Sequence, residues 1–334
     1  MKRICSCILL STIVVIGATG LLSWGTWGHQ HINRAAVFAL PESMRPFFYN
    51  HIDFITEESV VPDIRKYAIN DKAEFARHYI NPESYTDKPL ETLPQTMQEA
   101  KAMFADSSLQ KSGILPWYML EMMDKLTNMF RDHKKTEILF LAGDLAHYIG
   151  DAHMPLHTAL NHDGQLTNQR GIHAFWESQL PEKFGESYNL YTGEAVFIPD
   201  VKKEIWRIIS DSHRLADTVL LKEKELRSRF PEDKMYEKDA AGNVIKNKYG
   251  QWVHSYEYAA AYHAALNGMI EKQLRLAIAA TANFWYTAWV NAGKPDINSL
   301  DPEALTKRNS KYYNQDIKLW KKGKVFGFKI DKEF

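Results

Sequence analysis

Residues 145–157 read Leu-Ala-His-Tyr-Ile-Gly-Asp-Ala-His-Met-Pro-Leu-His. This stretch continues apolar residues at helical spacing over residues 136–150, so it predicts the end of a helix. His147 and Asp151 stand four positions apart on that helix, and their side chains therefore project from the same face. The chain then turns and presents His157. Three side chains that can bind a metal are thus expected close together.

A second pair with the same spacing, His173 and Glu177, follows after a polar loop and is predicted on the next helix. Imidazole and carboxylate groups are ligands that suit zinc. One such pair alone often reflects a capping or surface hydrogen bond. Two pairs with His157 between them favour a metal site instead.

The N-terminal segment has the layout of a secretory signal peptide. Two basic residues precede a run of apolar and small residues at 4–22, and Ser23 is a small residue at the expected cut before Trp24. An uncleaved anchor is the alternative, because the run could just span a bilayer. We expect residues 1–23 to be removed and the protein to be exported, to a periplasm or out of the cell.

Both cysteines, Cys5 and Cys7, lie in this segment, so the mature chain is expected to have no disulfide and no thiolate ligand or nucleophile. The whole chain carries 41 basic and 41 acidic residues, and removing Lys2 and Arg3 leaves 41 − 2 = 39 basic ones. A near-neutral chain has no broad basic surface for duplex DNA. This argues against a DNA-coating protein, but not against an enzyme that takes a nucleic acid into a small site.

Most of the remaining chain predicts helix. Residues 239–253 predict a small β-hairpin inserted between helices, and the polar tail at 295–334 is expected to be a strand-like or irregular surface segment. No linker separates two domains, so we expect one all-α, multi-helical domain over residues 24–334. Besides 136–150, helices are predicted at 31–40, 115–130, 201–230 and 256–292, the last apolar nearly all round, as for a buried helix or helix pair.

The run from Leu145 to His157 resembles the signature of the zinc-dependent phospholipase C and S1/P1 nuclease superfamily. Members of that family are all-helical and hold three zinc ions in a cleft. Their mature chain begins with a tryptophan whose free amine and carbonyl oxygen bind zinc. In this chain Trp24 follows the expected cut, and Trp24-Gly-Thr-Trp-Gly-His29 is similar to the nuclease opening.

The resemblance implies a complete set of ligands in chain order: Trp24, His29, Asp63, His78, His147, Asp151, His157, His173 and Glu177. One zinc is expected on Asp63, His78, His147 and Asp151, and a second on His157, His173 and Glu177. The third is expected on the Trp24 terminus and His29, with Asp151 bridging to the first. A water activated by two zincs would attack phosphorus, and Asp63 would also act catalytically by orienting that water.

Three other histidines are expected to stay off the metals. His153 is interpreted as support for the ligands, and His162 as a loop residue. His31 is expected to point away from its neighbour His29.

The two branches of the superfamily differ around the cluster, and this chain mixes their features. The short spacing from Trp24 to His29 is nuclease-like, whereas Glu177 and the short loop from His157 to His173 are phospholipase-like. Phe75, Tyr79, Trp117 and Trp176 are candidate base-stacking platforms, with core packing as the alternative.

We therefore expect an exported hydrolase with three zinc ions that cleaves phosphate esters, with a slight lean to a phospholipase C-like phosphodiesterase. A nuclease that prefers single strands is the alternative, and a phosphoesterase of neither branch stays open. An alternative function of another class is that of a non-catalytic binding protein stabilised by zinc. The expected partner is a phospholipid or a single-stranded nucleic acid, with at most transient membrane contact and no stable nucleic-acid complex.

Overall fold

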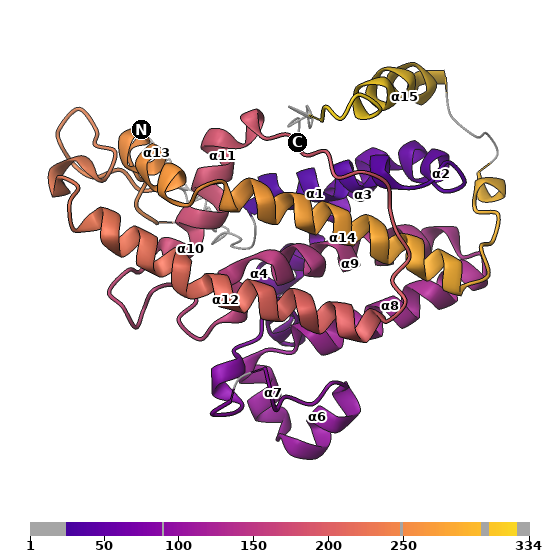
Figure 1. Ribbon diagram of the computed structural model, residues 1–334, viewed down its shortest axis with the longest axis horizontal. Helices are drawn as coiled ribbons and strands as arrows, with labels where there is room; N and C mark the ends of the chain where they lie inside the picture. Colours follow the sequence, from indigo (N-terminus) through magenta and orange to yellow (C-terminus); the bar gives the residue numbers. More distant parts are fainter. Residues whose placement is uncertain (1–24, 89, 248–249, 302–306, 326–334) are drawn as a thin grey trace, which may run out of the picture.

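The structure is a computed structural model and describes residues 25–88, 90–247, 250–301 and 307–325. The expected signal peptide and Trp24 lie outside the described residues. Within them the architecture consists of helices joined by loops, with β-bridges only as isolated pairs (Figure 1). The prediction of an all-α fold is therefore confirmed. Among the described residues, none of the helices is both long enough and apolar enough to cross a membrane.

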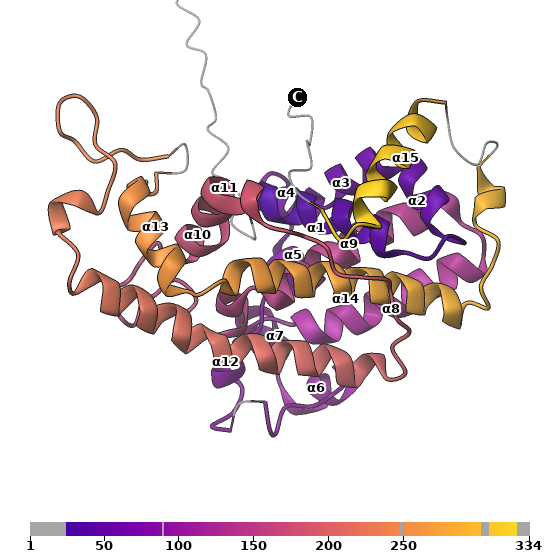
Figure 2. The same ribbon diagram turned by 45° about the horizontal axis from the view of Figure 1, so that its top comes forward.

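Four helices form the centre of the molecule. α8 packs on α9, α14 packs on both, and α1 packs on α9 and α14 (Figures 1 and 2). Trp285 of α14 is buried and stacks on Phe48 at 5.0 Å, while its indole N–H donates to the Ala142 carbonyl at 3.0 Å. The hydrogen bond to Ala142 fixes α14 against α9, which carries two predicted ligands. The bounds are α1 Gly25–Ala39, α8 Leu115–Arg131, α9 Lys135–His153 and α14 Met269–Asn291.

Two further helices lie beside this centre, where α12 packs on α8 and α9, and α13 packs on α12. α12 (Val201–Arg227) begins where the Asp200 side chain accepts a hydrogen bond from the Lys203 N–H at 2.9 Å, as an N-cap does. α13 (Tyr256–Ala265) is separated from α14 at Asn267 and Gly268, whose φ angles of 49° and 75° are left-handed and stop a helix. The apolar region at 256–292 is therefore a helix pair.

Short elements connect the long helices and carry several predicted ligands. The π-helix η4 continues directly from α10, and α6 and α7 form a separate small layer below the central helices in Figure 1. Their bounds are α2 Arg45–Asn50, α3 Ile52–Glu58, α4 Val61–Tyr67, α5 Lys72–Phe75, η1 Ala76–His78, η2 Pro82–Ser84, α6 Met97–Met103, α7 Asp106–Ser112, η3 Pro155–Thr158, α10 Ile172–Ala174, η4 Phe175–Gln179, α11 Leu180–Phe184, η5 Gly185–Ser187, η6 Glu232–Lys234 and η7 Asn298–Leu300.

The insertion between α12 and α13 reverses direction twice, where a single hairpin was expected. Antiparallel bridges join Lys238 to Val244, Lys246 to Trp252, and Tyr236 to His254. Three short extended pieces therefore lie side by side. We call residues 235–255 the inserted hairpin below.

The tail contains a helix, α15 (Lys307–Trp320), so the expectation of a strand-like or irregular segment is wrong there. Tyr313, Ile317 and Trp320 are buried and spaced by four and three residues, which places them on one helical face. The Tyr49 hydroxyl donates to Asp316 at 2.8 Å and ties α15 to α2. The many charged residues of the tail lie on its other faces and obscured this periodicity in the sequence.

Candidate metal centre

All the predicted ligands that the structure describes converge on one region inside the molecule. Every one of them is buried except His173, which is slightly exposed. They come from α1 (His29), α4 (Asp63), η1 (His78), α9 (His147 and Asp151), η3 (His157), α10 (His173) and η4 (Glu177). Segments far apart in the sequence thus bring together three carboxylates and five imidazoles.

Asp151 lies at the centre of this group because both of its oxygens face histidines. Oδ2 is 3.0 Å from His78 Nδ1 and 3.3 Å from His147 Nε2. Oδ1 is 3.5 Å from Nε2 of His29, whose ring stacks on His147 with centroids 3.9 Å apart. A carboxylate with one oxygen toward each of two histidine groups has the arrangement needed to bridge two cations.

Asp63 completes the first group. Its Oδ1 is 3.6 Å from His78 Nδ1, and ligand atoms of Asp63, His78 and His147 all lie within 4.8 Å of one another. His29, His147 and Asp151 satisfy the same criterion. His147 belongs to both sets, so the first and third predicted sites are contiguous.

His157, His173 and Glu177 form a second compact group, also within 4.8 Å. Glu177 Oε2 lies 3.2 Å from His173 Nε2 and 3.6 Å from His157 Nε2. Glu177 sits in the π-helix, a local widening of the helix that is frequent at functional sites. The second predicted ligand pair therefore does face one point.

The outer nitrogens of three histidines donate to backbone carbonyls. His147 Nδ1 donates to Ser59 at 2.7 Å, His157 Nδ1 to His78 at 2.6 Å, and His173 Nδ1 to His162 at 2.9 Å. A carbonyl only accepts hydrogen bonds, so Nδ1 of each ring carries a proton, and when the ring is neutral the Nε2 lone pair faces the cluster. This is the arrangement found around histidines that bind metals.

Several acceptor atoms in the cluster are buried without a hydrogen bond from the described residues. They are His157 Nε2, both carboxylate oxygens of Glu177, and Oδ1 of Asp63. Burying such atoms unpaired is costly, particularly for a carboxylate. Nitrogen and carboxylate oxygen donors are also the ones zinc binds. The donor set and its unpaired atoms therefore fit zinc.

The charges in the cluster shift several pKa values. Burial lowers the pKa of His147, but the Asp151 and Asp63 carboxylates outweigh it and raise the value to about 9. Burial and the neighbouring His147 lower the pKa of His29 to about 4, so its ring is neutral. Burial raises the pKa of Glu177, but His173 and His157 bring it down to about 2. The Glu177 carboxylate is therefore ionised and attracts positive charge to this point.

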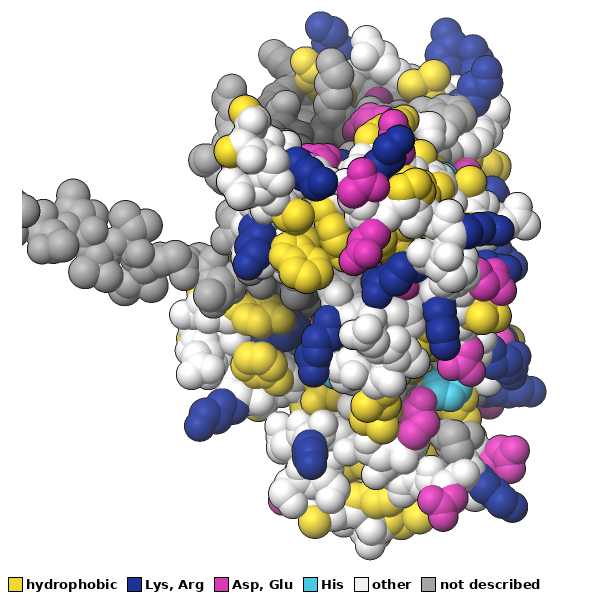
Figure 3. All heavy atoms as spheres, turned by 90° about the vertical axis from the view of Figure 1, so that its left-hand side faces the viewer, with side chains coloured by type: hydrophobic (Ala, Val, Ile, Leu, Met, Phe, Trp, Pro, Cys, Tyr) yellow, Lys and Arg dark blue, Asp and Glu magenta, His cyan; other side chains and the backbone are white. Residues whose placement is uncertain are grey.

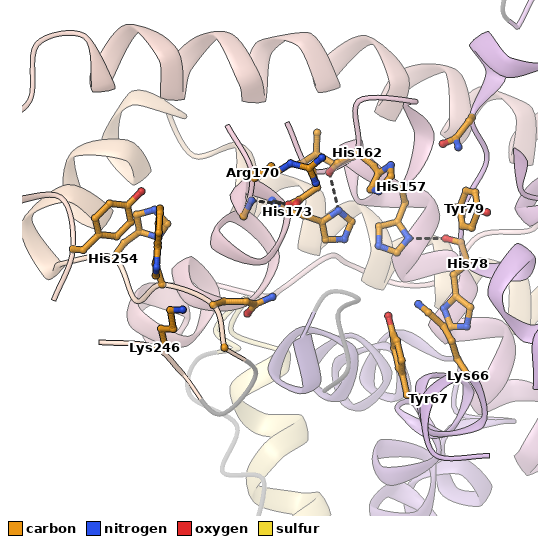
Figure 4. A pocket seen from close by; sticks show the side chains of 18 of the residues that line it. Lys66, Tyr67, His78, Tyr79, His157, His162, Arg170, His173, Lys246 and His254 are labelled. Carbon is orange, nitrogen blue, oxygen red and sulfur yellow. Dashed lines mark hydrogen bonds between the residues drawn. The ribbon is translucent and has the colours of Figure 1, made fainter. Parts of the chain in front are cut away.

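A cavity of about 740 Å³ opens over the cluster. Figure 4 shows His157 and His173 between two sides, with Lys66, Tyr67 and Tyr79 on one and Lys246 and His254 on the other. Basic residues outnumber acidic ones in the lining: Lys66, Lys111, Arg170 and Lys246 against Asp163. A bound anionic group would therefore meet favourable charge on either side of the metal ligands.

Glu74 supports His78, a role the sequence reasoning missed. Its Oε1 lies 3.5 Å from His78 Nε2 and accepts a hydrogen bond from Tyr148, while Oε2 accepts from Arg65 at 3.2 Å and Arg77 at 2.8 Å. Glu74 precedes His78 by four residues, the same spacing that singled out His147 and Asp151. The signal was present in the sequence.

The structure decides between the two alternatives for the aromatic candidates and corrects the interpretation of His153. Trp117 and Trp176 are buried in the core and cannot stack on a base, and Phe75 does not line the cavity, unlike Tyr79. His153 was expected to support the ligands, but its ring donates to the Ile149 carbonyl at 2.8 Å.

The positions of His162 and His31 agree with expectation. His162 is a loop residue whose carbonyl holds His173. His31 stacks on Trp27 at 3.7 Å.

Comparison with protein families identifies the family of the chain. The model of the S1/P1 nuclease family matches residues 24–284, which is most of the chain and contains every predicted ligand. No curated protein matches the chain.

Proposed function

The chain belongs to the S1/P1 nuclease family of zinc-dependent phosphodiesterases, and from that premise we propose that it cleaves single-stranded nucleic acids. Family membership leaves the alternative of a non-catalytic binding protein without support. The observation that carries the proposal is the buried cluster of imidazoles and carboxylates beneath a cavity whose charged lining residues are mostly basic.

We propose the following zinc ligands. Asp63, His78, His147 and Asp151 hold one ion, and His157, His173 and Glu177 hold a second. The Trp24 amine and carbonyl oxygen and His29 hold a third, bridged to the first by Asp151. Zinc in such a cluster lowers the pKa of bound water and polarises phosphoryl oxygens.

The residues of the chain arrange the reaction around the metals. Asp63 is proposed to orient the attacking water, which is consistent with its buried Oδ1 that accepts no hydrogen bond from the described residues. Lys66 Nζ lies 3.6 Å from that oxygen and lines the cavity, so its charge can hold a phosphate beside Asp63. Burial lowers the pKa of Lys66, but Asp63 and its neighbours raise it above its ordinary value, so the ammonium is charged.

The charge of the cavity favours a polyanion over a phosphatidylcholine head group. Asp163, its acidic lining residue, already accepts the Gly171 N–H at 2.9 Å and the His173 N–H at 3.3 Å. A quaternary ammonium would need carboxylates or aromatic faces free of competing cations. A phospholipase C activity stays the second candidate because of Glu177 and the short loop that precedes His173.

The substrate is tested by side-by-side hydrolysis of single-stranded DNA and phosphatidylcholine vesicles with the zinc-loaded protein starting at Trp24. Chelator-sensitive release of nucleotides is expected. Release of phosphocholine alone would replace the nuclease proposal by the phospholipase one. If neither substrate is hydrolysed, both the nuclease and the phospholipase proposals are overturned.

We also propose that the protein is exported and that cleavage before Trp24 creates the third zinc site. One added residue before Trp24 moves the free amine away from the cluster. We expect such an extended protein to lose about one zinc per chain and to lose activity, as measured by elemental analysis and DNA hydrolysis. Unchanged zinc content and activity would contradict the role of Trp24.

A further inference from the structure

The inserted hairpin presents one chemically distinct face to the cavity. Residues that pair across an antiparallel bridge point to the same side, and side chains two apart share a face. Tyr236 pairs with His254, and Lys246 pairs with Trp252, which is two residues before His254. All four side chains therefore lie on one face, and all four line the cavity that opens over the metal ligands.

The hairpin is fixed to the helix that carries Glu177. The Gln179 side-chain amide donates to the Trp252 carbonyl at 3.1 Å, and its oxygen accepts from the His254 N–H at 3.0 Å. Lys183 of α11 donates to Glu237 at 3.0 Å. Gln179 is only two residues beyond Glu177, so the face is held in place relative to the metal cluster.

The chemistry of this face combines a flat ring with positive charge. Trp252 is 51% exposed despite its size, and Tyr236 packs against its edge with ring centroids 5.0 Å apart. Lys246, and Arg170 on the loop before His173, are exposed and line the cavity. Figure 3 views the end of the molecule that carries the hairpin, where hydrophobic side chains lie among charged side chains of both signs.

We propose that this face is a nucleotide subsite, in which Trp252 stacks on an unpaired base of the substrate and Lys246 and Arg170 bind a phosphate beside the one being cleaved. The proposal rests on the proposed function, since it deepens the same site. An unpaired base exposes the ring faces that stacking needs, whereas bases in a duplex are already stacked on their neighbours. The subsite would therefore select single strands over duplexes.

The test compares Trp252→Ala, Trp252→Phe and Lys246→Ala with two matched controls on α15, Tyr312→Ala and Lys318→Ala. Tyr312 is 49% exposed and Lys318 is exposed, and neither lines the cavity. The substrates are a short single-stranded oligonucleotide and methyl 4-nitrophenyl phosphate, a diester that has no base and only one phosphate. Circular dichroism checks that each variant is folded.

For Trp252→Ala, kcat/KM on the oligonucleotide is expected to fall roughly 5- to 150-fold more than kcat/KM on the small diester, the range expected for one stacked base. Trp252→Phe keeps a ring and is expected to restore most of the loss. For Lys246→Ala, the slope of log KM against log salt is expected to decrease by about 0.7.

Two results would overturn the subsite. If Trp252→Ala and Lys246→Ala match their controls while the unmodified protein cleaves single strands, the subsite is absent and the proposed function stands. If the unmodified protein cleaves phosphatidylcholine vesicles and no nucleic acid, the proposed function fails and the nucleotide subsite fails with it.

Discussion

Asp151 has its central place because two local features coincide at the end of α9. The spacing of four residues from His147 puts both side chains on one helical face. The turn that follows brings His157 back toward the same point, where its Nδ1 lies 3.7 Å from Asp151 Oδ1. A set of buried charges this compact is tolerated only if it is neutralised, which is what bound cations do.

Glu74 allows a test of whether a residue that lies beside a predicted zinc ligand contributes to zinc affinity. Because its carboxylate orients His78, Glu74→Gln is expected to weaken zinc binding by roughly 10- to 100-fold. The measurement is competition with a chromophoric chelator, and the control is Glu121→Gln, since Glu121 is exposed and pairs with Lys125 at 2.7 Å. Equal zinc affinities for the two variants would show that Glu74 does not support the site.

His254 predicts a loss of stability in acid. Burial lowers its pKa from 6.5 to about 3 in the folded protein. Below pH 6.5 the unfolded chain therefore binds a proton that the folded protein does not, and the free energy of unfolding falls as the pH falls toward 3. At pH 5 this loss is about 2 kcal/mol.

In His254→Asn this acid loss is expected to be absent, although the variant should be less stable at pH 7 because it loses the ring stacked on Phe175 at 3.6 Å. Urea unfolding at pH 7 and pH 5 with chelator present measures the effect. His133→Asn is the control, because His133 is exposed and has a φ of 56° that asparagine accepts. Parallel pH dependence in all three proteins would refute the assignment.

At the scale of the elements, the packing of α9 against α1 depends on Gly150. A Cβ at this position would meet Nδ1 and Cε1 of His29 at 3.0 and 3.1 Å, closer than ordinary contacts. Elsewhere in a helix interior, Gly→Ala stabilises by roughly 0.5–1 kcal/mol. At position 150, Gly→Ala would instead push the ring of His29, a predicted zinc ligand, out of its place.

Gly150→Ala is therefore expected to weaken zinc binding at the His29 site about tenfold, comparable to the loss of a supporting contact. The group of His157, His173 and Glu177 should keep its affinity, since it lies on other elements. Stepwise zinc titration by calorimetry separates the two classes of site. A titration curve identical to that of the unmodified protein would show that α1 accommodates the methyl group.

The elements also show what could be read from the sequence. The long helices and the pairs His147–Asp151 and His173–Glu177 were predictable because helical spacing is a local property, whereas the other ligands followed only from the family resemblance. The choice between one helix and two over residues 256–292 was left open, and the structure places the break at Asn267 and Gly268. The exposure of aromatic residues was not predictable, since Trp117 is buried and Trp252 is half exposed. That difference depends on long-range contacts such as the one from Gln179 to the hairpin.

At the scale of the whole molecule, the packing of the helices brings together predicted ligands that are far apart in the sequence. His29 and Glu177 belong to α1 and η4, which pack on each other. The fold thus carries the candidate metal ligands inside its core, while the inserted hairpin and the loop before His173 line the cavity on one side and Lys66, Tyr67 and Tyr79 line it on the other. The proposed chemistry and the proposed nucleotide subsite therefore lie on different parts of the structure.

The most direct measurement is zinc content per chain together with hydrolysis of single-stranded DNA, for the protein starting at Trp24 and for His157→Ala. Three zinc ions per chain and chelator-sensitive hydrolysis are expected for the unmodified protein. His157→Ala should keep its helical circular dichroism, lose about one zinc and lose hydrolysis. Full hydrolysis by zinc-free protein, or by a His157→Ala variant that has lost its zinc, would contradict a zinc-dependent reaction at this cluster.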